Sequence, residues 1–137
     1  MGPCKHPWRE NVITMIGETG RLFSPQYPRS FADSIQCTWI ITAPEGKFVK
    51  LSIKTLQLGP DCHYFALYIW DGQNSSSDLL KKYCKDEGFQ SRLPYVFSNG
   101  RHLSVKFRSL DYFGSCVSKF DAVFEVVNQG KISLLTQ

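Results

Sequence analysis

The sequence predicts an all-β domain, organised as an antiparallel sandwich or barrel. Clusters of proline, glycine, asparagine and serine recur at intervals of roughly eight to twelve residues, which is the spacing of turns in such folds. Short runs of β-branched and aromatic residues lie between these clusters, and no helix of useful length is evident. A chain of 137 residues fits one domain that can bury roughly two-thirds of its unfolded surface.

The predicted strands follow one another with a turn signal after each. They are "CTWIIT" (37–42), "FVKLSIKTL" (48–56), "YFALYIW" (64–70), "HLSVKFRS" (102–109) and "FDAVFEVV" (120–127). The turns are "SPQYP" (24–28), "APEG" (43–46), "LGPD" (58–61), "DGQNSSSD" (71–78), "SNGR" (98–101) and "DYFG" (111–114). Apolar and polar residues alternate in 49–54 and 103–108, which indicates strands with one buried and one solvated face.

The run 64–70 differs because both of its faces are apolar. Phe65, Leu67 and Ile69 fall on one side, and the other side carries Tyr68 and Trp70. The second face therefore needs a cover. One candidate is the N-terminal segment "HPWRENVITMI" (6–16), which would pack over Tyr68 and Trp70.

Composition limits the possible functions. The apolar fraction of 42% is globular, and no apolar run approaches the roughly 18 residues of a membrane span, so we expect no membrane insertion. The net charge of +4 is mild and scattered, which does not indicate nucleic acid binding. The three histidines are His6, His63 and His102. No nucleophile elbow accompanies them, and a Cys-His dyad would need a free thiol at a position that the expected disulfides occupy, so no catalytic residue and no cofactor is predicted.

Cysteine usage points to an oxidising compartment. The five cysteines, Cys4, Cys37, Cys62, Cys84 and Cys116, form no C-x-x-C pair, so disulfides are favoured over a zinc or redox site. The sequon at Asn74 predicts N-glycosylation and agrees with this compartment. No signal-peptide core is visible, and we therefore expect a segment of a longer secreted or membrane-anchored protein, with residues 1–3 as an added start.

Taken together, these segments resemble a CUB domain from about Cys4 to Val127. The resemblance rests on a glycine before a short strand, Ser-Pro-x-Tyr-Pro, Cys-x-Trp-x-Ile, Pro-x-Gly, Cys-x-Tyr and Asp-Gly in order. The matching residues are Gly20, Ser24, Pro25, Tyr27, Pro28, Cys37, Trp39, Ile41, Pro44, Gly46, Cys62, Tyr64, Asp71 and Gly72.

The resemblance implies a jelly-roll-like sandwich of two antiparallel sheets in a non-catalytic extracellular module that binds proteins or glycans. It also implies a CUB domain over 4–127, and the last residues, 128–137, lose the strand alternation and are expected to be a linker stub. By the same analogy Cys4 pairs with Cys37 and Cys62 with Cys84. Cys116 is then the odd cysteine, either unpaired or joined to another chain or domain.

One departure from the family concerns calcium. Many CUB domains hold the ion with three acidic side chains, and the corresponding positions here are Gln57, Phe65 and Leu110. Two of these supply no side-chain oxygen, so no metal is predicted. Asp61 and Asp111 lie near in sequence and are either ordinary turn acids or substitutes for a weak site.

Two partner surfaces follow as hypotheses. In the first, Phe65, Leu110, Tyr112 and Phe113 form an apolar tip that binds an extracellular protein without calcium. In the second, Lys50, Lys54, Lys106 and Arg108 bind a sulfated glycan, provided that their two strands are neighbours and share one polar face. The tip rings could instead fold into the loops, and the basic face could simply be solvated.

Overall fold

The computed structural model describes residues 10–25, 34–59, 62–84, 89–90, 93–110 and 118–128. Its strands are β1 (Glu10–Ile16), β2 (Thr19–Phe23), β3 (Ile35–Thr42), β4 (Phe48–Gln57), β5 (Phe65–Asp71), β6 (Asp78–Tyr83), β7 (Phe89–Gln90), β8 (Val96–Phe97), β9 (His102–Ser109) and β10 (Lys119–Val127). The described residues contain no helix, so the all-β prediction is confirmed for them.

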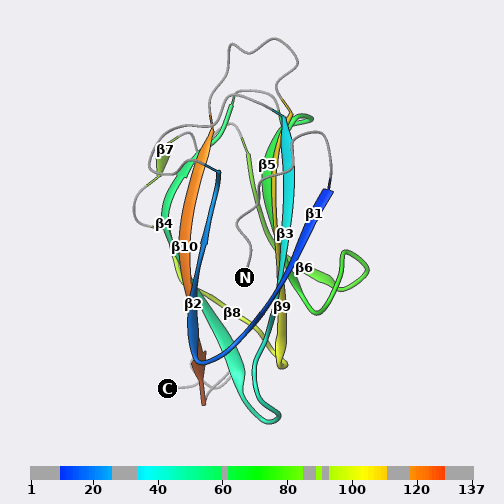
Figure 1. The fold of residues 1–137 in the computed structure, drawn as a ribbon, viewed down its shortest axis with the longest axis vertical. Coiled ribbons are helices and arrows are strands. Elements are labelled where there is room, and N and C mark those ends of the chain that lie inside the picture. Colours follow the sequence, from blue (N-terminus) through cyan, green and yellow to red (C-terminus); the bar gives the residue numbers. More distant parts are fainter. Residues whose placement is uncertain are drawn as a thin grey trace.

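The strands form two sheets that face each other as a sandwich (Figure 1). Sheet A has the order β1-β3-β9-β5-β6, and sheet B has the order β2-β10-β4-β7, with β8 also paired to β4. All described pairings are antiparallel except that of β1 with β3. The two-sheet sandwich confirms the expected fold, and the parallel β1 adds an edge to sheet A that the strand pattern did not predict.

The core lies between the sheets and is centred on aromatic rings from both of them. Trp39 of β3 is 5.5 Å from Phe120 of β10 between ring centroids, and Phe107 of β9 stacks on the same ring at 5.7 Å. All three side chains are at most 2% exposed. Burying rings of this size supplies a large share of the hydrophobic stabilisation.

Glycines act at two defined points of this packing. Gly46, at a φ of 80°, lies in the turn closed by the bond from the Lys47 amide to the Pro44 carbonyl, where a type II turn needs a left-handed residue. At Gly20 a Cβ would lie 2.4 Å from the Phe124 ring, so this ring packs directly on the backbone of β2. The sequence signal Pro-x-Gly thus corresponds to a real turn.

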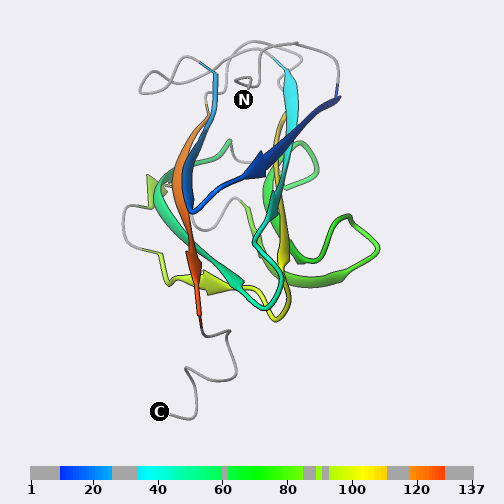
Figure 2. The same ribbon diagram turned by 60° about the horizontal axis from the view of Figure 1, so that its bottom comes forward.

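The β5–β6 hairpin forms one edge of sheet A, and its loop projects from the sheet (Figure 2). Its loop is tied back to the sheet because the Ser104 hydroxyl of β9 donates to the Gly72 carbonyl at 2.6 Å. The Cys62–Cys84 disulfide joins the segment before β5 to the end of β6, and the two cysteines have a sequence separation of 22. This pair is one of the two that the family resemblance implied, and its prediction is confirmed.

Candidate recognition surface

The second face of β5 lies on the outer face of sheet A. Its aromatic side chains are flanked there by charged side chains of the neighbouring strands. Phe65, Leu67 and Ile69 point into the core, which places Tyr68 and Trp70 on the outside. These two rings stack almost parallel, with centroids 5.4 Å apart and planes 4° apart. Both remain half-buried, so an aromatic pair is offered on the surface of the sheet.

Three cations surround Tyr68 on this face. Lys82 of β6 and Lys106 of β9 are its cross-strand neighbours, and Arg108 of β9 lies one pair along. The Lys82 ammonium is 5.4 Å and the Arg108 guanidinium 5.3 Å from the Tyr68 ring centroid, distances at which a cation is attracted to the ring. We call Tyr68, Trp70, Lys82, Lys106 and Arg108 the aromatic–cation cluster.

The members of the cluster differ in how firmly they are held. Arg108 donates to the Tyr68 hydroxyl at 2.8 Å and to the Cys62 carbonyl at 3.4 Å, which fixes its guanidinium against the sheet. Its Nε is buried and has no hydrogen-bond partner among the described residues. Lys106 pairs with Glu10 of β1 at 3.2 Å, whereas the exposed Lys82 has no carboxylate among its described contacts. The cluster therefore keeps a positive charge that an acidic ligand could complement.

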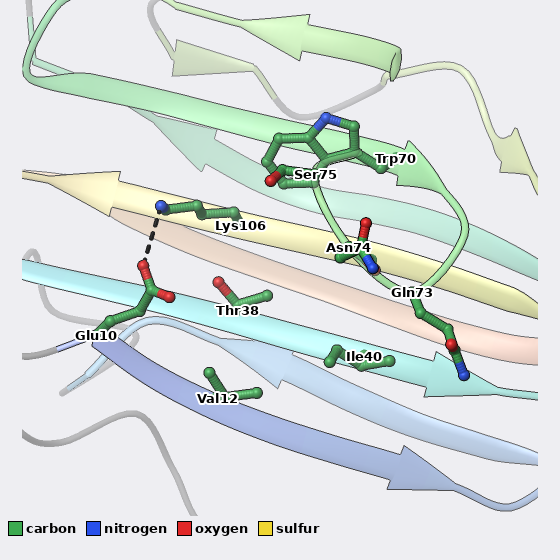
Figure 3. Close-up of a pocket in the computed structure, with 10 residues that line it drawn as sticks. Glu10, Val12, Thr38, Ile40, Trp70, Gln73, Asn74, Ser75 and Lys106 are labelled. Atoms are coloured by element: carbon green, nitrogen blue, oxygen red, sulfur yellow. Dashed lines mark hydrogen bonds and ion pairs between the residues drawn. The ribbon is translucent and has the colours of Figure 1, made fainter. Parts of the chain in front are cut away.

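A pocket of about 240 Å³ opens on the same face, between β1 and the β5–β6 hairpin loop. Figure 3 shows Thr38, Ile40 and Lys106 across its floor, with Val12 and Glu10 on the β1 side. Trp70 lies on the other side, together with the hairpin-loop residues Gln73, Asn74 and Ser75. Ser104 completes the lining.

His102 supports the hairpin loop from β9. Its Nδ1 lies 3.0 Å from the Thr42 hydroxyl and its Nε2 3.3 Å from the Gln73 amide nitrogen. Partial burial and the adjacent Arg101 charge lower the pKa of His102 below its ordinary value. A neutral ring can accept from Gln73 and donate to Thr42, so the neutral form is the one that holds the loop.

The predicted basic strand face does not assemble as one surface. Lys50 and Lys54 lie on β4 of sheet B, whereas Lys106 and Arg108 lie on β9 of sheet A. The condition on which the shared face depended, that the two strands are neighbours, is therefore not met. Lys50 is already paired with Glu125 at 3.2 Å and lies over the Tyr95 ring.

The predicted apolar tip does not include Phe65. Phe65 is only 3% exposed and packs in the core, where a Cβ on Gly59 would lie 2.6 Å from its ring. It is therefore a core residue and not part of an exposed tip, because it points to the same side as Leu67. The segments around Phe65 and Leu110 do meet as expected, through the bond from the Leu110 amide to the Tyr64 carbonyl. Tyr112 and Phe113 lie outside the described residues.

The remaining predicted residues are placed as follows. Cys37 is buried and disulfide-bonded; Cys4, its predicted partner, lies outside the described residues, as does Cys116. Asn74 is exposed in the hairpin loop, as its glycosylation requires.

The residues at the family's calcium positions do not fit the ion. Phe65 is buried among apolar groups, and Leu110 at the end of β9 offers no side-chain oxygen, so two of the three carboxylates are missing. Within the described ranges no three acidic, histidine or cysteine residues come together as a metal site. Asp61 and Asp111 lie outside those ranges.

Sequence reasoning missed part of this surface. The run at 64–70, which is apolar on both faces, was the sequence signal for Tyr68 and Trp70. It correctly indicated that the second face of this strand carries aromatic side chains. The expected cover, residues 6–16, is corrected in its described part: β1 joins sheet A beside β3 and is separated from β5 by β3 and β9. No pattern in the sequence distinguished Lys82 or Val12, since their roles depend on long-range pairing.

Comparisons with known proteins agree on one family. The pattern of the CUB domain matches residues 11–123. The chain is 37% identical to human procollagen C-endopeptidase enhancer 1 over 70 residues, covering 50% of this chain and 16% of that protein. It is 32% identical to human cubilin over 101 residues, covering 72% of this chain and 3% of that protein. The chain thus spans only a small part of these relatives.

Solved structures give the same fold. The CUB1-EGF-CUB2 domains of rat MASP-1 match with a TM-score of 0.66 and 25% identity, covering 85% of this chain and 43% of that one. The extracellular region of zebrafish Gpr126/Adgrg6 matches with a TM-score of 0.65 and 22% identity, covering 87% of this chain and 15% of that one. No helix in the described part of the chain is long and apolar enough to span a membrane.

Proposed function

The chain belongs to the CUB domain family, and from this premise we propose that it is a non-catalytic recognition module of a larger extracellular protein, secreted or membrane-anchored. Its ligand is an acidic segment of another extracellular protein, bound without calcium on the outer face of sheet A. The observation that carries the proposal is the aromatic–cation cluster, which joins two stacked rings to three cations on one face. Aromatic and arginine side chains are the groups that most often dominate binding energy at protein interfaces.

Charge complementarity supports an acidic partner. The aromatic–cation cluster has three cations. Among its described ion pairs, one cation, Lys106, is paired with a carboxylate, that of Glu10. Arg108 is pre-positioned by Tyr68 and by the Cys62 carbonyl, so little of its conformational freedom is left to lose on binding. Calcium independence is supported by Phe65 and Leu110, which cannot supply the carboxylates of the family's metal site.

The test compares charge reversals on the two sheets. The wild-type domain is used to retain proteins from extracellular medium in calcium-free buffer with chelator. The double variant Lys82→Glu/Lys106→Glu should no longer retain these proteins. The matched control, Lys50→Glu/Lys54→Glu, changes the charge equally on sheet B and should keep them. Equal retention by both variants, or retention that requires calcium, would contradict the proposal.

A sulfated glycan is the second candidate, and the same three cations favour it. Heparin retention in physiological salt that is lost in Lys82→Glu/Lys106→Glu would support this ligand. A protein ligand also needs the rings, so Tyr68→Ser should weaken it by at least about tenfold, or ~1.4 kcal/mol. Heparin binding depends mainly on charge, so its affinity should fall much less in that variant.

A further inference from the structure

The pocket on sheet A has an amphipathic lining that suits a sugar ring. Its apolar part consists of Val12, Ile40 and Trp70, and Val12 is 59% exposed although it is a large aliphatic residue. Its polar part includes the Gln73 amide and the Lys106–Glu10 pair. A pyranose presents an apolar face of C–H groups and a polar rim of hydroxyls. Its apolar and polar parts thus match those of the pocket lining. Ligand sites in proteins are commonly apolar with a few polar groups that fix orientation.

The size of the pocket selects a small occupant. Its volume of about 240 Å³ lies below the roughly 300–1,000 Å³ of pockets that hold drug-sized ligands. It is therefore suited to a single ring and not to a peptide segment.

The only asparagine of the chain in a glycosylation sequon lines this pocket. Asn74 begins the Asn-Ser-Ser sequence in the hairpin loop. Its Oδ1 accepts from the Ser76 amide at 2.9 Å, and its carbonyl accepts from the Ser77 amide at 3.0 Å. The described contacts thus use the oxygen of the amide and leave its Nδ2 for attachment.

The loop that carries Asn74 is anchored to the pocket floor. Ser104, which lines the pocket, donates to the Gly72 carbonyl at 2.6 Å, and Gln73 lies against His102. Since two neighbours of Asn74 in sequence are bonded to β9, the asparagine is held beside the pocket. A sugar joined to Nδ2 would then start at the mouth of the pocket, with little further entropy to lose on entering it.

We propose that the first N-acetylglucosamine of an N-glycan on Asn74 occupies this pocket and packs against Trp70 and Val12. Attachment joins Nδ2 to the anomeric carbon of a lipid-linked oligosaccharide diphosphate donor. The amide loses one proton, and the bond from the sugar to the diphosphate breaks. The glycan thereby covers the β1 side of the outer face together with Trp70, and it leaves Tyr68, Lys82 and Arg108 of the aromatic–cation cluster open to a ligand. The inference does not depend on the identity of the protein's ligand.

The experiment uses the full chain from a secretory host that adds oligomannose glycans. It carries Trp8→Phe, so that Trp70 is the tryptophan accessible to a quencher while Trp39 is only 2% exposed. Ser76→Thr keeps the sequon, and Ser76→Ala removes it without changing Asn74. Endoglycosidase treatment of the first variant leaves a single N-acetylglucosamine.

We expect acrylamide quenching of Trp70 to be roughly twofold weaker in the Ser76→Thr protein than in the Ser76→Ala protein, because an occupied pocket shields its wall. The trimmed protein should keep this protection, since the first sugar is the one that packs. Its Tm should also exceed that of Ser76→Ala by about 2–4 °C. Equal quenching with and without the sugar, or an unmodified mass for the Ser76→Thr protein, would overturn the inference.

A second pair of variants tests the position of the sugar. Val12→Ser should abolish most of the glycan-dependent protection of Trp70, because it removes the apolar wall. Ile16→Ser is the matched control: this residue is on the same strand and 77% exposed, but it does not line the pocket. If both variants keep full protection, the sugar does not pack on this wall and the inference is wrong.

Discussion

Replacing Phe65 with alanine separates the packing of this ring from a role in binding. The ring is 3% exposed and lies against the backbone of Gly59, so no exposed tip can use it. Removing a buried phenylalanine ring costs about 3–5 kcal/mol, as lost burial plus the cavity left behind. For a chain of 137 residues this corresponds to a fall in Tm of about 10–17 °C.

Urea unfolding followed by near-ultraviolet circular dichroism measures this cost. The matched control is Tyr95→Ala, which removes a ring that is 58% exposed and should cost less than about 1 kcal/mol. The refuting result would be a Phe65→Ala protein that is as stable as the wild type and binds its partner at least about tenfold more weakly, ~1.4 kcal/mol. That result would return Phe65 to a binding tip.

Four further outcomes are expected. Replacing Cys62 and Cys84 together with serine should lower the free energy of unfolding by about 3 kcal/mol in urea titrations, because the bridge closes a loop of 22 residues. Because the pKa of His102 is lowered in the fold, its contribution to stability is complete above the ordinary value of 6.5 and is lost as the pH falls below it; His102→Gln should flatten this part of the Tm profile. Millimolar calcium should leave Tm unchanged, and a rise reversed by chelator would contradict this. Replacing Tyr112 and Phe113 with serine should leave partner affinity unchanged in a folded protein, because the proposed site is the outer face of sheet A; a loss of at least about tenfold would assign binding to a tip instead.

Local pattern was enough to identify the family and five of the described strands, β3, β4, β5, β9 and β10. The alternation of Leu103, Val105 and Phe107 with polar neighbours correctly predicted which side of β9 is buried, because successive side chains of any strand point to opposite faces. The pairing of Cys62 with Cys84 was also correctly implied by the resemblance. Such features depend on residues close in the chain or on a motif with fixed order.

The assignment of strands to sheets required the tertiary structure. Lys50 and Lys106 have the same local pattern, a cation between two inward-facing aliphatic or aromatic residues, yet their strands lie in opposite sheets. Phe65 likewise matched a loop position of the family but points into the core beside Leu67. Alternation defines two faces for each strand, and it carries no information on which other strand will pair with it.

The sequence by itself therefore determined five of the described strands, the disulfide-bearing CUB framework and the unusual second face of β5. Only the tertiary structure decided what lies on that face. Cross-strand pairing brings Lys82 and Lys106 to Tyr68 from segments 14 and 38 residues away, and the anchored hairpin places Asn74 at a pocket shared with β1. The physical reason is that a binding surface on a sheet is formed across strands, by hydrogen-bonded neighbours that are distant in the chain.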